Sequence, residues 1–81
     1  MKALVHVTLK QQVLDPQGKA IARACASLGY EAVTSVRQGK LFEVRLDAAD
    51  EVAARNLANE LCEKLLANTV IEDYEVVRLD P

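Results

Sequence analysis

The chain contains no tryptophan, a single histidine, two cysteines and only three glycines. His6 has no cysteine or carboxylate near it at the spacing of a metal site, so we expect an ordinary strand residue rather than a ligand. Cys25 and Cys62 do not form a CxxC motif, and each lies at or beside an apolar helical stripe, which indicates small buried thiols. No glycine pattern matches a phosphate-binding loop. From these absences we expect no catalytic, metal-binding or cofactor-binding residue in this chain.

Aromatic residues make up only 4% of the chain, and no apolar run approaches the ~20 residues of a membrane span. A sheet that binds RNA needs exposed aromatic side chains on its central strands, whereas here only Phe42 is available and we expect it to face the core. We therefore expect neither a nucleic-acid partner nor a membrane partner. Met1-Lys2 leads into a strand pattern rather than a signal peptide, and isolated cysteines suit a reducing compartment, so we expect a cytoplasmic protein.

What is present is a short chain rich in small apolar residues. Its 81 residues, 51% of them hydrophobic, make one globular domain, residues 1–81. A core built largely of alanine is thin, so self-association or a larger partner is expected. Residues 1–46 carry seven Lys and Arg against three Asp and Glu, whereas residues 47–81 carry three against nine. This uneven distribution of charge along the chain suits either a charged partner or a solvated surface.

The first half of the chain predicts a strand and then a helix. Residues 3–10 alternate as a half-buried strand. Asp15 can cap a helix and Pro16 fits its first position, because no N–H is needed there. Gly18 in the first turn either lets another backbone approach closely or is merely tolerated. Gly29 is expected to end the helix in the left-handed conformation. The predicted buried stripe consists of Ile21, Ala24, Cys25 and Leu28.

The second half predicts two strands, a helix and a last strand. Residues 32–46 alternate on both sides of Gly39, which could supply the positive φ of a hairpin turn. A single long strand bent at Gly39 is the alternative. Asp47 or Asp50 caps a helix that runs to about Ala67, and residues 71–79 form the last strand. The predicted buried stripe of this helix consists of Ala54, Leu57, Ala58, Leu61 and Leu65.

This order of elements predicts a ferredoxin-like βαββαβ α+β domain, with two helices on one face of an antiparallel sheet. The other face would be open. Leu4, Val36 and Leu41 lie among polar residues there, which predicts dimerisation through that face or through a sheet edge.

The segment Val36-Arg37-Gln38-Gly39-Lys40 carries the most conspicuous exposed chemistry. In a hairpin, Arg37 and Lys40 would be cross-strand neighbours of like charge, which is unfavourable unless an anion or an acidic partner lies nearby. Two long side chains that spread into water are the alternative.

Four segments together resemble one known family, in the same order and at the same spacing. The family is PurS, the small subunit of phosphoribosylformylglycinamidine synthase, and the resemblance covers nearly the whole chain, though from Asp47 onward only in pattern. The motif positions are Asp15, Pro16, Gln17, Gly18, Arg37, Gly39 and Lys40, which we expect to contact partners. The segments are Val7–Lys10, Val13–Ala20, Leu28–Tyr30 and Val36–Lys40.

The resemblance implies a role that no spacing of residues could show. In that family the complex converts formylglycinamide ribonucleotide, ATP and glutamine to the amidine, and the ATP and magnesium are used by the synthetase subunit, PurL. PurS is a non-catalytic subunit that bridges PurL and the glutaminase PurQ, supports ammonia transfer, and forms homodimers or homotetramers. An ACT-like module that binds a small regulatory molecule is the alternative, because it shares this topology.

Overall fold

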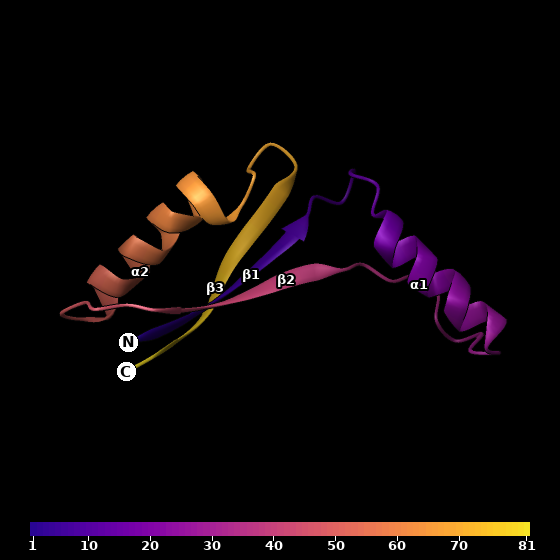
Figure 1. Cartoon of the computed structure of the whole chain (residues 1–81), viewed down its shortest axis with the longest axis horizontal. Helices are drawn as coiled ribbons and strands as arrows, with labels where there is room; N and C mark the ends of the chain where they lie inside the picture. The colour runs from indigo at the N-terminus through magenta and orange to yellow at the C-terminus, as the bar shows by residue number, and fades with distance from the viewer.

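The computed structural model describes all residues from Met1 to Pro81, and its centre is a three-stranded antiparallel sheet (Figure 1). The strands are β1 (Lys2–Leu9), β2 (Gly39–Arg45) and β3 (Glu72–Asp80), in the order β2-β1-β3. Ala3, Val5 and Val7 alternate along the central strand and are buried on one face. The alternation of residues 3–10 therefore predicted both the strand and its buried face.

One helix covers this face. Asp50 caps α2 (Glu51–Leu61) by accepting a hydrogen bond of 2.8 Å from the backbone N–H of Ala53, and α2 continues into the π-helical turn η1 (Cys62–Leu66). Ala54 and Ala58 are buried against the sheet, where their small side chains allow close contact. The wider π turn rotates the residues that follow. Cys62, at the start of the turn, continues the buried line of Ala54 and Ala58, and Ala67 beyond it is also buried, whereas Leu65, expected in the buried stripe, is 75% exposed.

A side-chain hydrogen bond ties η1 to β3. The Tyr74 hydroxyl donates to the Glu63 carboxylate at 2.6 Å. This bond, together with burial and the carboxylate charge, raises the pKa of Tyr74 to about 12. The predicted i,i+4 ion pairs on the exposed side are also present, Glu51 with Arg55 at 3.6 Å and Glu60 with Lys64 at 2.8 Å. The hydrogen bond therefore holds η1 against β3, and the two ion pairs lie along α2 and η1.

The other helix lies away from the sheet. α1 (Pro16–Ser27) and the chain that returns from it, residues 28–38, project beyond one end of the strands (Figure 1). We call residues 16–38 the arm. Gly29, with φ of +90°, ends the helix as predicted. The arm gives the chain a radius of gyration of 15.9 Å, against roughly 12 Å for a compact domain of this length.

The α+β class, the antiparallel sheet and the order of the helices along the chain are as expected, but two details differ. Residues 32–37 are not in the sheet, and α1 does not cover it. The hairpin is wrong because Gly39 lacks the positive φ that its turn requires, and instead begins β2. The alternative of a single long strand bent at Gly39 is not found either, because residues 33–38 belong to no strand.

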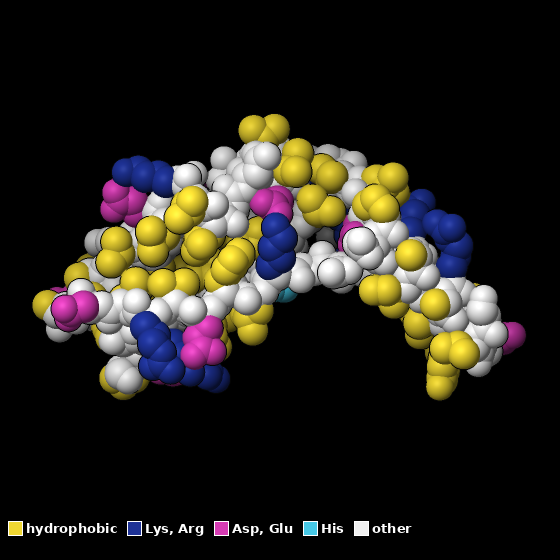
Figure 2. Space-filling view, in the orientation of Figure 1, with side chains coloured by type: hydrophobic (Ala, Val, Ile, Leu, Met, Phe, Trp, Pro, Cys, Tyr) yellow, Lys and Arg dark blue, Asp and Glu magenta, His cyan; other side chains and the backbone are white.

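Because the arm is extended, the expected apolar stripe of α1 has no cover within the chain. Ile21 is 43% exposed and Leu28 is 74% exposed. Figure 2 shows hydrophobic side chains gathered along the arm as well as over the sheet region. Only ten of the 81 residues are buried, so the isolated chain leaves unusually much apolar surface in water. No helix has both the length and the apolar character to cross a bilayer.

Candidate functional site: the joint between the arm and the sheet

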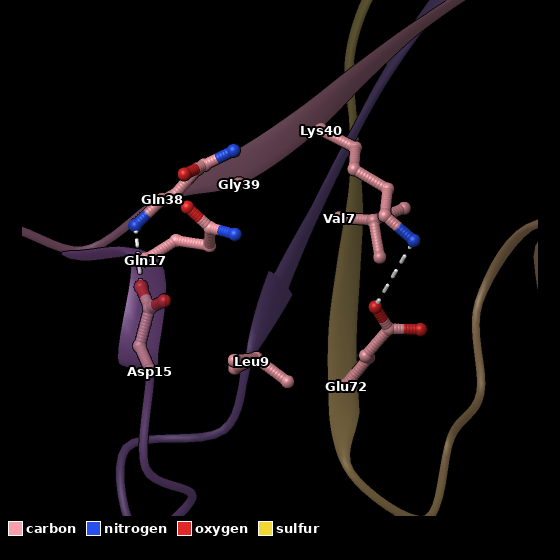
Figure 3. Close-up of a pocket in the computed structure, with 8 residues that line it drawn as sticks. All are labelled: Val7, Leu9, Asp15, Gln17, Gln38, Gly39, Lys40 and Glu72. Atoms are coloured by element: carbon pink, nitrogen blue, oxygen red, sulfur yellow. Dashed lines mark hydrogen bonds and ion pairs between the residues drawn. The ribbon is translucent and has the colours of Figure 1, made fainter. Parts of the chain in front are cut away.

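The two sequence motifs meet where the arm joins the sheet (Figure 3). One comes from the start of α1, residues 15–18, and the other leads into β2, residues 36–40. We call these two segments together the joint. All seven motif positions named from the sequence therefore lie in one place, although about twenty residues separate the segments.

Asp15 is the centre of the joint, and its side chain is only 3% exposed. One carboxylate oxygen accepts a hydrogen bond from the N–H of Gly18 at 3.0 Å, and the other accepts one from the N–H of Gln38 at 2.6 Å. A single side chain thus caps α1 and also binds the segment that leads into β2. The cap itself was predicted from the sequence, and Pro16 occupies the first helical position as expected.

These contacts hold the pKa of Asp15 below its ordinary value of 3.8. The N–H group of Gly18 contributes most and that of Gln38 next, because both stabilise the charged carboxylate. Burial acts in the opposite direction, and the positive charge of Arg37 lowers the pKa further. The joint is therefore built around an ionised carboxylate.

Gly18 allows the backbones of the two segments to touch. A Cβ atom at this position would clash with the carbonyl oxygen of Val36 and would lie 2.7 Å from the Asp15 carboxylate. Of the two roles that the sequence left open for Gly18, close backbone approach is the one found. Its neighbour Gln17 is exposed and lines the cavity described below.

Arg37 fastens the joint to the loop between β1 and α1. Its guanidinium donates to the carbonyl oxygens of Lys10 and Val13, each at 3.0 Å, and lies 3.5 Å from that of Leu9. The side chain is therefore bound to its own chain. It does not face Lys40 across a turn, so the expected pair of like charges is wrong.

Lys40 and Gly39 occupy the other side of the joint. The Lys40 ammonium lies 3.7 Å from the Glu72 carboxylate on β3 (Figure 3). A Cβ atom on Gly39 would lie 2.9 Å from Nε2 of His6 and 3.0 Å from the Val7 carbonyl oxygen. Gly39 is thus suited to close packing on β1. The sequence predicted a turn at this position instead.

A cavity of about 240 Å³ lies between these segments. Its polar lining is largely paired within the chain, Lys40 with Glu72 and Asp15 with two backbone N–H groups. No three His, Cys, Asp or Glu side chains come together in a way that could hold a metal ion. The arrangement fixes geometry rather than presenting a reactive group. The lining residues are Val7, Leu9, Asp15, Gln17, Gln38, Gly39, Lys40 and Glu72.

Two residues that line the cavity were missed by reasoning from sequence. Glu72 was interpreted as solvated charge at the start of a strand, and Gln38 only as part of a turn. No local signal identifies Glu72, because Lys40 is 32 residues away in sequence and two strands away in the sheet. Partner contact by the seven motif positions stays a prediction; five of them, Pro16, Gln17, Arg37, Gly39 and Lys40, are exposed.

The lowered pKa of Asp15 predicts how the joint responds to acid. Because the carboxyl group has a lower pKa when folded than when unfolded, its contribution to stability is present above pH ~4. It is lost as the pH falls through the folded pKa, below 3.8. We expect Asp15→Asn to be less stable than the wild type at pH 6 and to lose less stability between pH 6 and 3. Thermal unfolding followed by circular dichroism across this range measures the difference.

Glu60→Gln is the control for the acid response, because the pKa of Glu60 is also lowered, by its exposed bond with Lys64. This variant should retain most of the acid dependence of the wild type, since an exposed pair is screened by solvent. Parallel acid profiles of the wild type and Asp15→Asn would show that the carboxylate does not hold the joint.

Known proteins match this chain over nearly its whole length. The family described as "PurS: Phosphoribosylformylglycinamidine (FGAM) synthase" matches residues 2–80. The phosphoribosylformylglycinamidine synthase subunit PurS of Mycobacterium leprae is 51% identical over 77 residues, which cover 95% of this chain and 94% of that protein. PurS of Bacillus subtilis has the same fold with a TM-score of 0.80 at 50% identity, covering 91% of each chain.

A chain in the structure of PurLQS from Thermotoga maritima also matches, with a TM-score of 0.81 at 28% identity, covering 93% of this chain and 94% of that one. The fold and these matches place the chain in the class of small α+β subunits of a larger synthase. Within that class, the chain belongs to the PurS family. The match extends to residue 80, beyond the motifs that carried the resemblance.

Proposed function

We propose that this chain is the non-catalytic assembly subunit of phosphoribosylformylglycinamidine synthase in purine biosynthesis. It bridges the synthetase PurL and the glutaminase PurQ and supports the passage of ammonia from glutamine to formylglycinamide ribonucleotide. The observation that carries this proposal is the match to PurS subunits along 95% of the chain, including a neighbour from a PurLQS assembly. On this proposal, ATP and magnesium act in the synthetase subunit, and the complex is cytoplasmic.

The shape of the chain supports a role in assembly. The arm projects from the sheet and carries exposed apolar side chains, including Leu14 at 61% and Tyr30 at 62% exposure. Large apolar side chains in such positions are typical of surfaces that other chains cover. The joint fixes the direction of the arm, which a bridging subunit needs if it is to hold two partners in a set geometry.

Reconstitution of the complex tests this proposal. PurL and PurQ from the same organism are mixed with and without this chain, and amidine formation is followed with either glutamine or ammonium as the nitrogen source. Without the chain, we expect the glutamine-dependent rate to fall on the order of tenfold or more, because ammonia must then cross bulk solvent to reach the synthetase. Ammonium-dependent activity should survive in part. Equal glutamine-dependent rates with and without the chain would contradict the proposal.

The ACT-like alternative is not favoured by the comparisons, which match PurS subunits throughout. Calorimetry of this chain alone against amino acids and nucleotides separates the two functions. Binding with micromolar affinity would favour the regulatory module.

A further inference from the structure

Three cationic side chains have no carboxylate partner within the chain, and all three lie in one groove. Every other Lys and Arg side chain forms an ion pair with an Asp or Glu. The three exceptions are Lys19 and Arg23 of α1 and Arg37. They line a groove of about 370 Å³ between α1 and residues 34–37. Unpaired cations gathered in one groove attract negative charge.

The fold of the arm brings these cations together. Lys19 and Arg23 are four residues apart, which places both on one face of α1, and both are exposed. The returning segment adds the hydroxyl groups of Thr34 and Ser35 to the same groove. Ile21 of the apolar stripe is about half a helical turn away from each cation. The basic face of α1 is therefore separate from its apolar face, and Figure 2 shows both kinds of side chain on the arm.

Arg37 adds fixed positive charge to the groove. Its hydrogen bonds to the carbonyl oxygens of Lys10 and Val13 all come from one atom, Nη2. Nε and Nη1 therefore have no partner within the chain, although a guanidinium group carries five N–H donors in all. Arg37 can hold the joint and still contribute its charge to the groove.

One carboxylate, that of Asp15, also lines the groove. It is 3% exposed, and its two oxygens accept hydrogen bonds from the backbone N–H groups of Gly18 and Gln38. It is therefore not free to pair with Lys19. The arm itself contains a single acidic residue, Glu31, against its three cations. The groove is thus positively charged, and the chain does not neutralise it.

We propose, on the basis of the function proposed above, that this groove docks an acidic surface of another subunit of the complex. Asp and Glu side chains of that subunit accept charge-assisted hydrogen bonds from Lys19 and Arg23. The hydroxyl groups of Thr34 and Ser35 donate further hydrogen bonds to the same carboxylates. Such a contact steers the two chains together and selects an acidic partner over others.

The chain has no acidic surface of its own that would fit this groove. Apart from Glu31, Asp47 and Glu75, every Asp and Glu side chain is held within the chain by an ion pair, a helix cap or a hydrogen bond. These three lie in different parts of the chain, in the arm, before α2 and on β3. A surface dense enough in carboxylates to meet two adjacent cations therefore belongs to a different chain.

Removal of the two cations of α1 tests this proposal. Lys19→Gln and Arg23→Gln are combined in the full chain, and its binding to PurL, to PurQ and to their mixture is measured by biolayer interferometry. At about 50 mM salt we expect the double variant to bind about tenfold or more weakly than the wild type, with a smaller loss of affinity at about 300 mM. Its melting temperature and its oligomeric state by light scattering should match those of the wild type, because both side chains are exposed and unpaired.

Arg55→Gln with Lys64→Gln is the matched control, because it also removes two exposed helical cations and changes the net charge equally. It should keep the affinity and salt dependence of the wild type, since exposed pairs contribute little to stability. An equal loss of binding in this control would overturn the proposal, because net charge alone would then explain the effect.

The other outcomes separate this proposal from the proposed function. A Lys19→Gln, Arg23→Gln variant that binds like the wild type would overturn the docking groove alone. A changed oligomeric state would overturn it too, by placing the two side chains between copies. Saturable binding of pyrophosphate to the wild-type chain alone, lost in the double variant, would make the groove a phosphate site instead. A wild-type chain that binds neither subunit nor their mixture would contradict the proposed function as well.

Discussion

Gly18→Ala is expected to lower the free energy of unfolding by about 3 kcal/mol, because the new methyl group meets backbone rather than a movable side chain. It would clash with the carbonyl oxygen of Val36 and approach the Asp15 carboxylate to 2.7 Å. Either α1 or residues 36–38 must move, which breaks the hydrogen bond between Asp15 and Gln38. Urea unfolding followed by circular dichroism measures the loss.

The sign of this change separates two explanations of Gly18. Helix propensity alone favours alanine over glycine by roughly 1 kcal/mol in a helix interior. A glycine that is merely tolerated would therefore give a variant as stable as the wild type or more stable, and that result would contradict the joint. Gln17→Ala is the control, because Gln17 is exposed in the same turn and its replacement should change stability by less than about 0.5 kcal/mol.

The structural change in Gly18→Ala should also weaken assembly. If the arm changes direction, the exposed apolar side chains of α1 move relative to the sheet, and a partner can no longer contact both in the same geometry. We therefore expect Gly18→Ala to weaken both self-association and the glutamine-dependent activity of the reconstituted complex. Gln17→Ala should leave self-association intact.

Features that depend on sequence neighbours were predictable from the sequence. The cap at Asp15, a cap at Asp47 or Asp50 and the left-handed Gly29 each depend on a few adjacent backbone groups; all three are found, the second cap at Asp50. The alternation of residues 3–10 predicted one strand of the sheet, and residues 71–79 were predicted as another; both are found. In each case the interactions that decide the structure lie within one helical turn or along one strand.

The position of the arm could not be predicted in the same way. The pattern of residues 33–44 suits a hairpin within the chain, but residues 33–38 pair with no strand and Gly39 lacks the positive φ of a turn. The backbone conformation at Gln38-Gly39 decides this, and it is held by contacts from more than twenty residues away, Asp15 with Gln38 and the Lys10 carbonyl group with Arg37. The exposure of Leu65 has a similar origin, since one wide turn at η1 changes the direction of every residue that follows.

For the candidate site, the sequence identified the residues better than their roles. The two motifs do converge, but Gly39 packs on β1 instead of forming a turn, and Arg37 binds carbonyl groups of its own chain. A motif shows that a position is constrained without showing by what. Asp15, Gly18 and Arg37 each make close contacts within the chain, and their contact with partners stays a prediction.

Arg37→Ala is expected to destabilise the chain by about 1–2 kcal/mol, since its charged donors are lost from the Lys10 and Val13 carbonyl groups. These carbonyl groups can turn to water because the site is exposed, which limits the loss. The loop between β1 and α1 would no longer be held against residues 36–38, and the arm would become mobile at its base. The dimer should weaken as a consequence.

Lys40→Ala is the matched control, because it removes a cation from the same segment. The pair with Glu72 is long, at 3.7 Å, and the Lys40 side chain is 64% exposed. Pairs of this kind contribute about 0–1 kcal/mol. Any loss of partner binding in this variant, without loss of stability, would identify Lys40 as a contact.

The central claim is that the two motifs form an internal joint that sets the direction of the arm, and the melting temperatures of Arg37→Ala and Lys40→Ala test it most directly. The account predicts a fall of roughly 5–10 °C for Arg37→Ala and little change for Lys40→Ala. A variant Arg37→Ala that melts with the wild type, yet no longer enters the dimer or the complex, would contradict it and would make Arg37 a partner contact.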